Sequence, residues 1–118
     1  MESDFFSLSE LARAIETRNS GAVLGFYAAD ARMRIIDSEH PPSRPQEIIG
    51  RSAIAAYFDD VCGRTMTHRI EDGFVDGDRL AFTQACAYPD GTRVFCSAMA
   101  ELKAGKIASQ TIVQAWDA

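Results

Sequence analysis

Asp37 and His68 are the residues of this chain whose type and position best suit proton-transfer chemistry. Asp37 ends a strand-like segment, residues 31–37, in which Met33, Ile35 and Asp37 share one side. At the mouth of such an apolar surface, desolvation would disfavour the ionised carboxylate and make it a useful acid or base. Met33 and Ile35 would then contact the ligand. The alternative is a solvated aspartate that caps the following turn.

His68 stands in residues 67–70 (THRI), at the start of a series of strand-like segments. A histidine that faces Asp37 could exchange a proton near neutral pH. The alternative is a half-buried histidine satisfied by backbone groups, and the irregular alternation around Gly73 leaves its facing open. His40 lies in a proline-containing loop and is expected to be solvated.

Residues 65–116 carry the pattern of one antiparallel meander, which would position these side chains. Runs rich in β-branched, aromatic and small apolar residues predict strands, and short segments with glycine and aspartate or lysine predict the turns. The turn segments are residues 75–78, 88–92 and 102–106, and the strand segments are residues 80–88, 93–102 and 107–116.

The turn at residues 88–92 (YPDGT) predicts the register of the central hairpin. A three-residue loop with Gly91 in the left-handed region places Cys86 opposite Val94. The face that we expect to line a pocket then carries Phe82, Gln84, Cys86, Val94, Cys96, Ala98, Gln110, Ile112, Gln114 and Trp116.

The facing of the last strand depends on the turn before it. A three-residue loop that pairs Leu102 with Lys106 gives the inward set above. If residues 104–105 instead form a two-residue turn, the strand flips, and Thr111 and Val113 face inward.

Three amides and two aromatic side chains on this face are candidates for ligand binding. Buried amides need partners, so Gln84, Gln110 and Gln114 around one cavity would orient a polar ligand group or water. Alternatively, they pair with one another or face a partner subunit. Tyr57 and Trp116 could wall a ring-shaped ligand, or both could belong to the core.

The three cysteines, Cys62, Cys86 and Cys96, form no C-x-x-C pair, and their odd number fits a reducing cytoplasm. With no basic cluster in the nearby sequence, Cys86 and Cys96 are expected to be inert packing residues. The histidines and carboxylates do not approach metal-ligand spacing, and no phosphate loop or dinucleotide fingerprint is present. We therefore expect no metal and no cofactor.

Length and charge point to one domain, residues 1–118, with a single core. The net charge of −5 and the scattered basic residues argue against nucleic acid or an anionic membrane as partner. No apolar stretch approaches the roughly 20 residues of a membrane helix. The acidic residues 1–4 do not resemble the start of a signal peptide, so we expect a cytoplasmic location.

Three helices are expected before the meander. Residues 7–10 (SLSE) fit a capping box for a first helix that ends near Arg18, and residues 19–21 (NSG) begin a second. Ser52 would cap a third helix, which Gly63 would end. Residues 38–50 predict a long surface loop. This order of elements predicts an α+β fold with its helices on one face.

Four segments in this order resemble the nuclear transport factor 2-like superfamily, specifically its SnoaL-like branch. They are residues 26–31 (FYAADA), 49–54 (IGRSAI), 76–81 (DGDRLA) and the ending from 105 to 117. The resemblance implies a curved, cone-shaped antiparallel sheet, three helices on its concave face, an apolar pocket and a homodimer. It implies no single chemistry, because the fold hosts several kinds of enzyme as well as binding proteins. Residues 67–70 are similar to the strand that supplies a catalytic histidine in dehydratase-like relatives.

The same resemblance excludes one reaction. The positions of the tyrosine, the base and the protonated carboxylic acid of ketosteroid isomerases fall on Leu11, Ile35 and Ala98, which are apolar. The arginine and paired aspartates of the epoxide hydrolases are not visible on the late strands either.

Two hypotheses remain. The first is a cofactor-free isomerase, cyclase or dehydratase that acts on a cyclic or polyketide-like molecule, with Asp37 or His68 as acid/base. The second is a non-catalytic module for ligand binding or dimerisation. In either case, the outward stripe of Phe95, Met99 and Val113 is the expected dimer contact.

Overall fold

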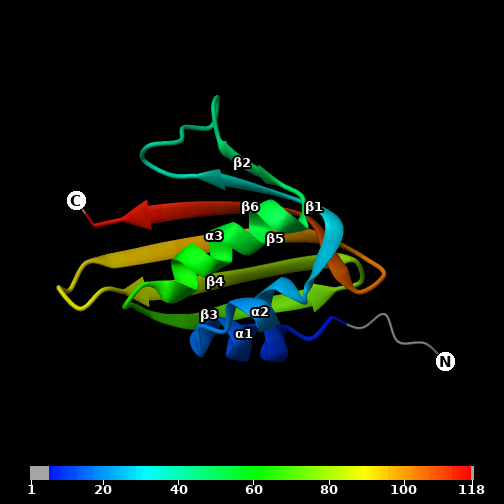
Figure 1. Cartoon of the computed structure of the whole chain (residues 1–118), viewed down its shortest axis with the longest axis horizontal. Helices are drawn as coiled ribbons and strands as arrows, with labels where there is room; N and C mark the ends of the chain where they lie inside the picture. The colour runs from blue at the N-terminus through cyan, green and yellow to red at the C-terminus, as the bar shows by residue number, and fades with distance from the viewer. Residues whose placement is uncertain (1–5, 118) are drawn as a thin grey trace.

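The computed structural model describes residues 6–117 and shows an α+β fold, with three helices on one face of a six-stranded sheet (Figure 1). Residues 1–4, on which the expectation about a signal peptide rests, lie outside the described part. The helices are α1 (Leu8–Glu16), α2 (Ser20–Leu24) and α3 (Arg51–Gly63). The strands are β1 (Tyr27–Ile36), β2 (Gln46–Ile49), β3 (Thr67–Asp76), β4 (Arg79–Ala87), β5 (Arg93–Lys103) and β6 (Lys106–Trp116).

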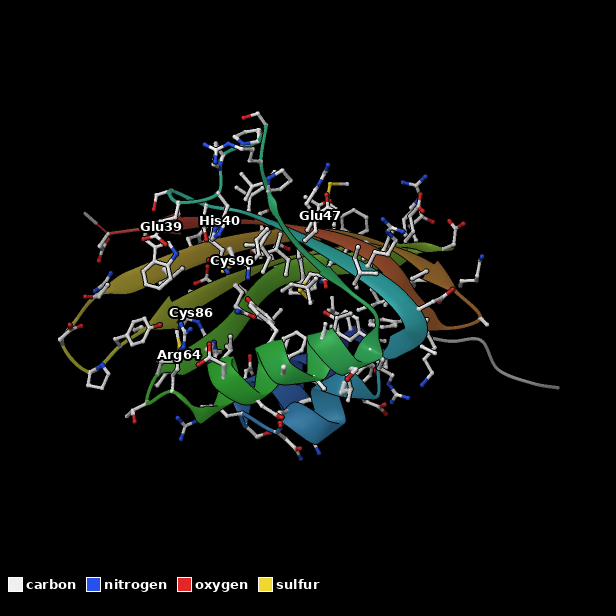
Figure 2. All side chains as sticks on the ribbon, turned by 45° about the horizontal axis from the view of Figure 1, so that its top comes forward. Glu39, His40, Glu47, Arg64, Cys86 and Cys96 are labelled. Carbon is white, nitrogen blue, oxygen red and sulfur yellow. The ribbon has the colours of Figure 1, made fainter. Side chains whose placement is uncertain are left out.

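The sheet has the strand order β2-β1-β6-β5-β4-β3 and curves over the helices (Figure 2). It is mixed rather than purely antiparallel, because β1 runs parallel to β6 while the other neighbouring strands are antiparallel. The turns between β3 and β6 force antiparallel pairing. No turn joins β1 to β6, so their direction is set by how the chain packs.

The central hairpin has the predicted register, with Cys86 opposite Val94 and Gln84 opposite Cys96. The next hairpin differs from the prediction. Its turn has two residues, Ala104 and Gly105, both at positive φ, and Lys103 pairs with Lys106.

A β-bulge in β6 compensates for the shorter turn. Leu102 pairs with Ile107 but Glu101 pairs with Ser109, so Ala108 is the extra residue. The bulge restores the facing that the turn would have reversed. Gln110, Ile112 and Gln114 therefore point to the helix side, as the three-residue loop also predicted.

The helix starts show which capping signals were sufficient. Ser7 accepts a hydrogen bond from the Glu10 amide at 3.2 Å, and Asn19 accepts one from the Ala22 amide at 3.1 Å, as expected. The third helix begins two residues earlier than expected. Its N-cap is Gly50, at a φ of 90°, so the prediction of Ser52 as the cap is wrong. Gly63 is the last residue of the helix rather than the glycine beyond it.

Two further segments differ from the sequence analysis. β1 begins at Tyr27 rather than near residue 31, and part of the expected loop 38–50 forms the short edge strand β2. β2 pairs with β1, which it can do because the Pro-rich segment before it turns the chain back.

The core fills the space between the helices and the concave face of the sheet. Leu11, Val23, Ile35, Ile54 and Ile107 are at most 1% exposed. No helix within residues 6–117 is long and apolar enough to span a membrane.

α1 packs closely on β3 at Gly73. A Cβ there would lie 2.6 Å from the Ala81 carbonyl oxygen and 2.9 Å from a methyl group of Leu8. Because Gly73 has no side chain, α1 can pack closely on β3, the strand that carries His68.

Candidate functional site

An open cavity of about 340 Å³ lies between α3, the segment after β1 and the adjoining parts of β3–β6. Its volume is in the range of small-molecule sites, roughly 300–1,000 Å³. Figure 2 shows Glu39 and His40 on the segment after β1, Arg64 at the end of α3, and Cys86 and Cys96 on the sheet. Of the nine residues proposed from sequence, seven line this outer cavity: Ile35, Asp37, Tyr57, His68, Gln84, Gln114 and Trp116.

A second, inner cavity of about 60 Å³ lies deeper, among apolar side chains of the helices and sheet. Tyr57, His68, Gln84 and Gln114 border both cavities and so form the wall between them.

Gln110 and Met33, the other two residues proposed from sequence, do not line the outer cavity. Gln110 borders the inner one and accepts a hydrogen bond from the Tyr27 hydroxyl. Burial raises the pKa of Tyr27, so this hydroxyl keeps its proton. Met33 lies opposite Gln110 in the sheet and is 1% exposed, which places it in the core.

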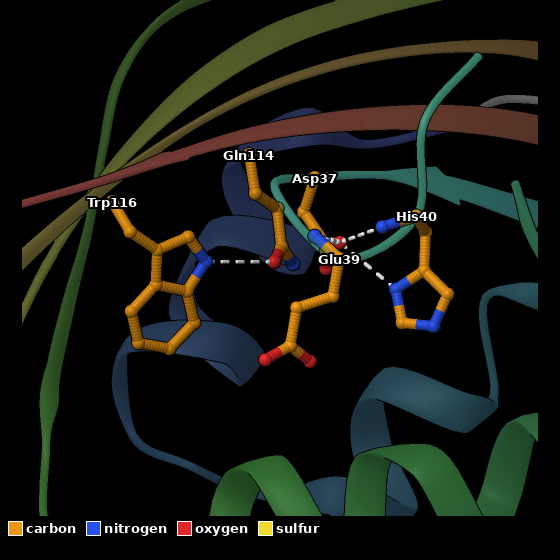
Figure 3. Close-up of polar contacts among 5 residues, drawn as sticks. All are labelled: Asp37, Glu39, His40, Gln114 and Trp116. Atoms are coloured by element: carbon orange, nitrogen blue, oxygen red, sulfur yellow. Dashed lines mark hydrogen bonds and ion pairs between the residues drawn. The ribbon is translucent and has the colours of Figure 1, made fainter. Parts of the chain in front are cut away.

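Asp37 caps the turn after β1 (Figure 3). Its Oδ1 atom accepts hydrogen bonds from the amides of Glu39 at 3.0 Å and His40 at 2.8 Å, and lies 2.8 Å from Nδ1 of the His40 ring. Asp37 therefore caps the turn, as the alternative considered for it from the sequence predicted. His40, which was expected to be solvated, is instead paired with the Asp37 carboxylate. Among residues 6–117, the Oδ2 atom of Asp37 makes no hydrogen bond.

His68 has a different partner. The residue is 8% exposed, and its Nδ1 atom lies 3.2 Å from Sγ of Cys86. Its Nε2 atom is buried without a hydrogen-bond partner in the described part of the chain. Asp37 and His68 thus line the same cavity, but no hydrogen bond joins them within residues 6–117.

A β-bulge decides the facing of His68. Ile70 pairs with Gln84 and Asp72 with Thr83, so Glu71 is an extra residue in β3. Without it, Arg69 rather than His68 would lie opposite Cys86. The bulge is held from α1, because the Ile70 amide donates a hydrogen bond to the Glu16 carboxylate at 2.9 Å.

Tyr57, Gln114 and Trp116 form one wall of the cavity. The indole Nε1 of Trp116 donates to Oε1 of Gln114 at 3.2 Å, and the indole stacks on Tyr88 with ring centroids 5.9 Å apart. Burial, opposed in part by a hydrogen bond with Gln114, raises the pKa of Tyr57 to about 12. Tyr57 is therefore a neutral hydrogen-bond donor over the whole physiological pH range.

Arg64 and Asp60 form an ion pair at the rim that the sequence analysis missed. The guanidinium lies 2.7 Å from the carboxylate and donates to the Tyr88 hydroxyl at 3.0 Å. The hydrogen bond between Arg64 and Asp60 lowers the pKa of the Asp60 carboxyl. The spacing of four residues at the end of a helix is a signal that could have predicted the pair.

Cys86 was expected to be an inert packing residue, but the structure places it at the outer cavity beside a histidine. It is 5% exposed, lines the outer cavity and lies directly opposite His68. Only the register between β3 and β4 places Cys86 opposite His68. The sequence alone could not predict this register, because β3 contains a bulge. No group of three or more potential metal ligands is formed by the side chains of the described residues.

A family model described as SnoaL-like domain matches residues 8–110. Among solved structures, a protein of unknown function from Burkholderia xenovorans, described as NTF-2 like, superposes with a TM-score of 0.78 at 18% identity, covering 92% of this chain and 79% of that one. No curated protein is significantly similar in sequence.

Two other structures carry names that suggest enzymes. A protein of Kribbella flavida proposed to be a ketosteroid isomerase has a TM-score of 0.72 at 14% identity, over 93% of this chain and 74% of that one. The epoxide hydrolase/cyclase-like enzyme SalBIII, studied for pyran ring formation in the polyether salinomycin, has a TM-score of 0.70 at 20% identity, over 91% and 86%. At these identities the likeness shows the fold alone.

Proposed function

The chain belongs to the SnoaL-like domain family of the nuclear transport factor 2-like superfamily, and from this we propose that it binds a small, largely apolar cyclic or polyketide-like carbonyl compound. We further propose that it catalyses proton transfer on this molecule without a cofactor, as an isomerase, cyclase or dehydratase does. The observation that supports catalysis is the fixed Asp37 carboxylate: one oxygen is held by the turn and His40, and the other is available at the cavity.

In this proposal Asp37 is the base. Its Oδ2 atom removes a proton from a carbon next to the substrate carbonyl, and the Tyr57 hydroxyl donates a hydrogen bond to the oxygen on which negative charge develops. The high pKa of Tyr57, about 12, keeps this donor protonated. Asp37 then returns the proton to the same or another carbon. Gln84 and Gln114 orient the substrate, and His68, which is engaged with Cys86, is not the first acceptor.

The apolar residues at the isomerase positions are consistent with a different placement of the base. Leu11 and Ile35 are 1% exposed and Ala98 is 3% exposed, so all three contribute to the core. A proton acceptor at Asp37 instead lies where β1 has ended, nearer the cavity mouth.

Solvent deuterium exchange tests the proposal. A panel of small cyclic ketones in D₂O is followed by proton NMR with the wild type, with Asp37→Asn and with Glu47→Gln. The first variant should lose at least about 100-fold in exchange rate, since general-base catalysis contributes roughly 10²–10⁴-fold. Glu47→Gln is the control, because it removes one negative charge just as Asp37→Asn does. Glu47 does not line the outer cavity, so this variant should exchange at the wild-type rate.

Two outcomes would contradict the proposal. Equal exchange rates for Asp37→Asn and the wild type would remove Asp37 from the chemistry. A ketone that binds tightly in the cavity with no exchange in any protein would favour the second hypothesis, a non-catalytic binding module.

We also propose a homodimer formed through the outer face of the sheet. Four large apolar side chains are exposed there: Phe74, Phe95, Met99 and Val113. Met99→Glu, at the most exposed of them, should shift the sedimentation coefficient from dimer to monomer at micromolar concentration. A monomeric wild type under the same conditions would contradict the proposal. The three free cysteines support a cytoplasmic location for this assembly.

A further inference from the structure

Polar groups surround the Cys86 sulfur at the sheet side of the outer cavity. The His68 ring nitrogen Nδ1 lies 3.2 Å from Sγ, and the Gln84 amide nitrogen donates to Sγ at 3.2 Å. Cys96 lies on the neighbouring strand β5, opposite Gln84. This arrangement of donors suits a sulfur that accepts hydrogen bonds, which is the role of a thiolate.

His68 supplies an independent observation. The residue is 8% exposed, and its Nε2 atom has no hydrogen-bond partner among the residues that the structure describes. A buried polar atom without a partner costs stability and calls for an explanation, of which a catalytic role is one. His68 borders both cavities, so a ligand that enters them would meet its ring.

The three cysteines differ in their electrostatics. Hydrogen bonds from Cys96, His68 and Gln84 lower the pKa of Cys86. The neighbouring Cys86 raises the pKa of Cys96, which stays a thiol and donates. Burial and the nearby Asp59 raise the pKa of Cys62. Only the thiolate is a nucleophile, so the site favours one of the three sulfur atoms.

We propose that Cys86, paired with His68, is a nucleophile that adds reversibly to the β-carbon of a conjugated carbonyl compound bound in the outer cavity. This rests on the proposed function in one respect: it assumes that the cavity accepts a carbonyl compound. The proposal narrows the ligand class to α,β-unsaturated ketones and places their covalent attachment at the Cys86 sulfur.

The addition is balanced without any co-reactant. The sulfur forms a bond to the β-carbon, and the electron pair of the carbon–carbon double bond moves toward the carbonyl oxygen. The Tyr57 hydroxyl, which lines the outer cavity together with Cys86, donates a hydrogen bond to that oxygen. The proton shared by the Cys86–His68 pair ends on the α-carbon. The reverse sequence restores the free thiolate and the unsaturated ketone.

Intact-protein mass spectrometry with cyclohex-2-enone tests the proposal. The wild type should gain the mass of one reagent molecule at pH 7, and peptide mapping should place it on Cys86. Cys86→Ser and Cys86→Ala should lose this adduct, whereas Cys62→Ser should keep it. Circular dichroism shows whether each variant is folded, and having two variants at Cys86 keeps the test valid if one misfolds.

A pH profile separates a role of His68 in ionisation from a structural one. An ordinary thiol with a pKa of about 8.5 is mostly protonated at pH 7, so His68→Asn should slow the addition about tenfold there. The difference should shrink above pH 9, where the thiol ionises unaided. An equal loss at both pH values, or labelling of Cys62 or Cys96 instead of Cys86, would overturn the proposal.

The same variants distinguish this inference from the proposed function. Asp37→Asn should lose deuterium exchange of a saturated ketone but still form the cyclohexenone adduct. Cys86→Ser should lose the adduct but still catalyse exchange. A wild type that exchanges the saturated ketone but forms no adduct would overturn this inference alone. A wild type that forms the adduct but catalyses no exchange would overturn the proposed proton transfer and leave this inference standing.

Discussion

The two polar groups of the outer cavity, around Asp37 and around Cys86, are built from contacts of very different range. Asp37 bonds to groups two and three residues away, inside one turn. Cys86 meets His68 across 18 residues, through two strands and a β-bulge. The first group depends on the local chain, whereas the second depends on register. The comparison predicts that damage to packing on β3 should affect Cys86 and leave Asp37 unchanged.

Gly73→Ala should produce the largest effect. The new Cβ would lie 2.6 Å from the Ala81 carbonyl oxygen and 2.7 Å from Cβ of Phe82, so the strands must separate. Overpacking of this kind costs roughly 1–3 kcal/mol in the free energy of unfolding, measured by urea denaturation. Gly63→Ala, at a position with open space, is the control and should not destabilise. Unchanged stability in Gly73→Ala would contradict this account of the packing on β3. A loss of ketone deuterium exchange by the folded variant would contradict the independence of Asp37.

Glu16→Ala should have a smaller effect, at the bulge itself. The Ile70 amide loses its charged acceptor, and a hydrogen bond on the exposed edge is worth about 1 kcal/mol. Cyclohexenone addition at Cys86 should slow several-fold, because His68 is less firmly placed, while deuterium exchange that depends on Asp37 stays constant. Glu16→Gln keeps an oxygen acceptor and should recover most of the rate. An equal loss in both assays would show that the two groups are not independent.

Tyr57→Phe should have the smallest effect, on the pH dependence of the free energy of unfolding. Tyr57 is the hydrogen-bond donor proposed for both the Asp37 and the Cys86 chemistry. Its pKa is raised from 10.0 to about 12, so its contribution to stability is complete below pH 10 and is lost as pH rises toward 12. Between pH 9 and pH 11 the free energy of unfolding of the wild type should fall by about 1 kcal/mol more than that of Tyr57→Phe. Parallel curves for the two proteins would mean that the hydroxyl is not buried in solution.

Local signals in the sequence were sufficient for features that depend on few residues. The caps at Ser7 and Asn19 and the register around Gly91 follow from the preferences of short segments, and the structure agrees with each. Asp37 at the mouth of a cavity belongs to the same group, since a strand end and the turn after it are read from adjacent residues. Its ring partner, His40, was within reach of the same reasoning but was expected to be solvated.

Other features could not be predicted because a single extra residue reverses the facing of a strand. The bulge at Ala108 cancels the two-residue turn and keeps Gln110 and Gln114 inward, so that prediction was confirmed by a different route from the one assumed. The bulge at Glu71 turns His68 toward Cys86, and it is held by a carboxylate from α1 that lies 54 residues away in the chain.

The sequence by itself thus determined the α+β class, the order of the elements, the turn that holds Asp37 and the resemblance to the SnoaL-like family. Only the tertiary structure decided that β1 runs parallel to β6, that Gln110 and Met33 belong to the core, and that Cys86 has a histidine beside it. The physical reason is the range of the interactions involved. Caps and turns satisfy backbone groups within a few residues, whereas register and burial minimise the free energy of the whole packed chain.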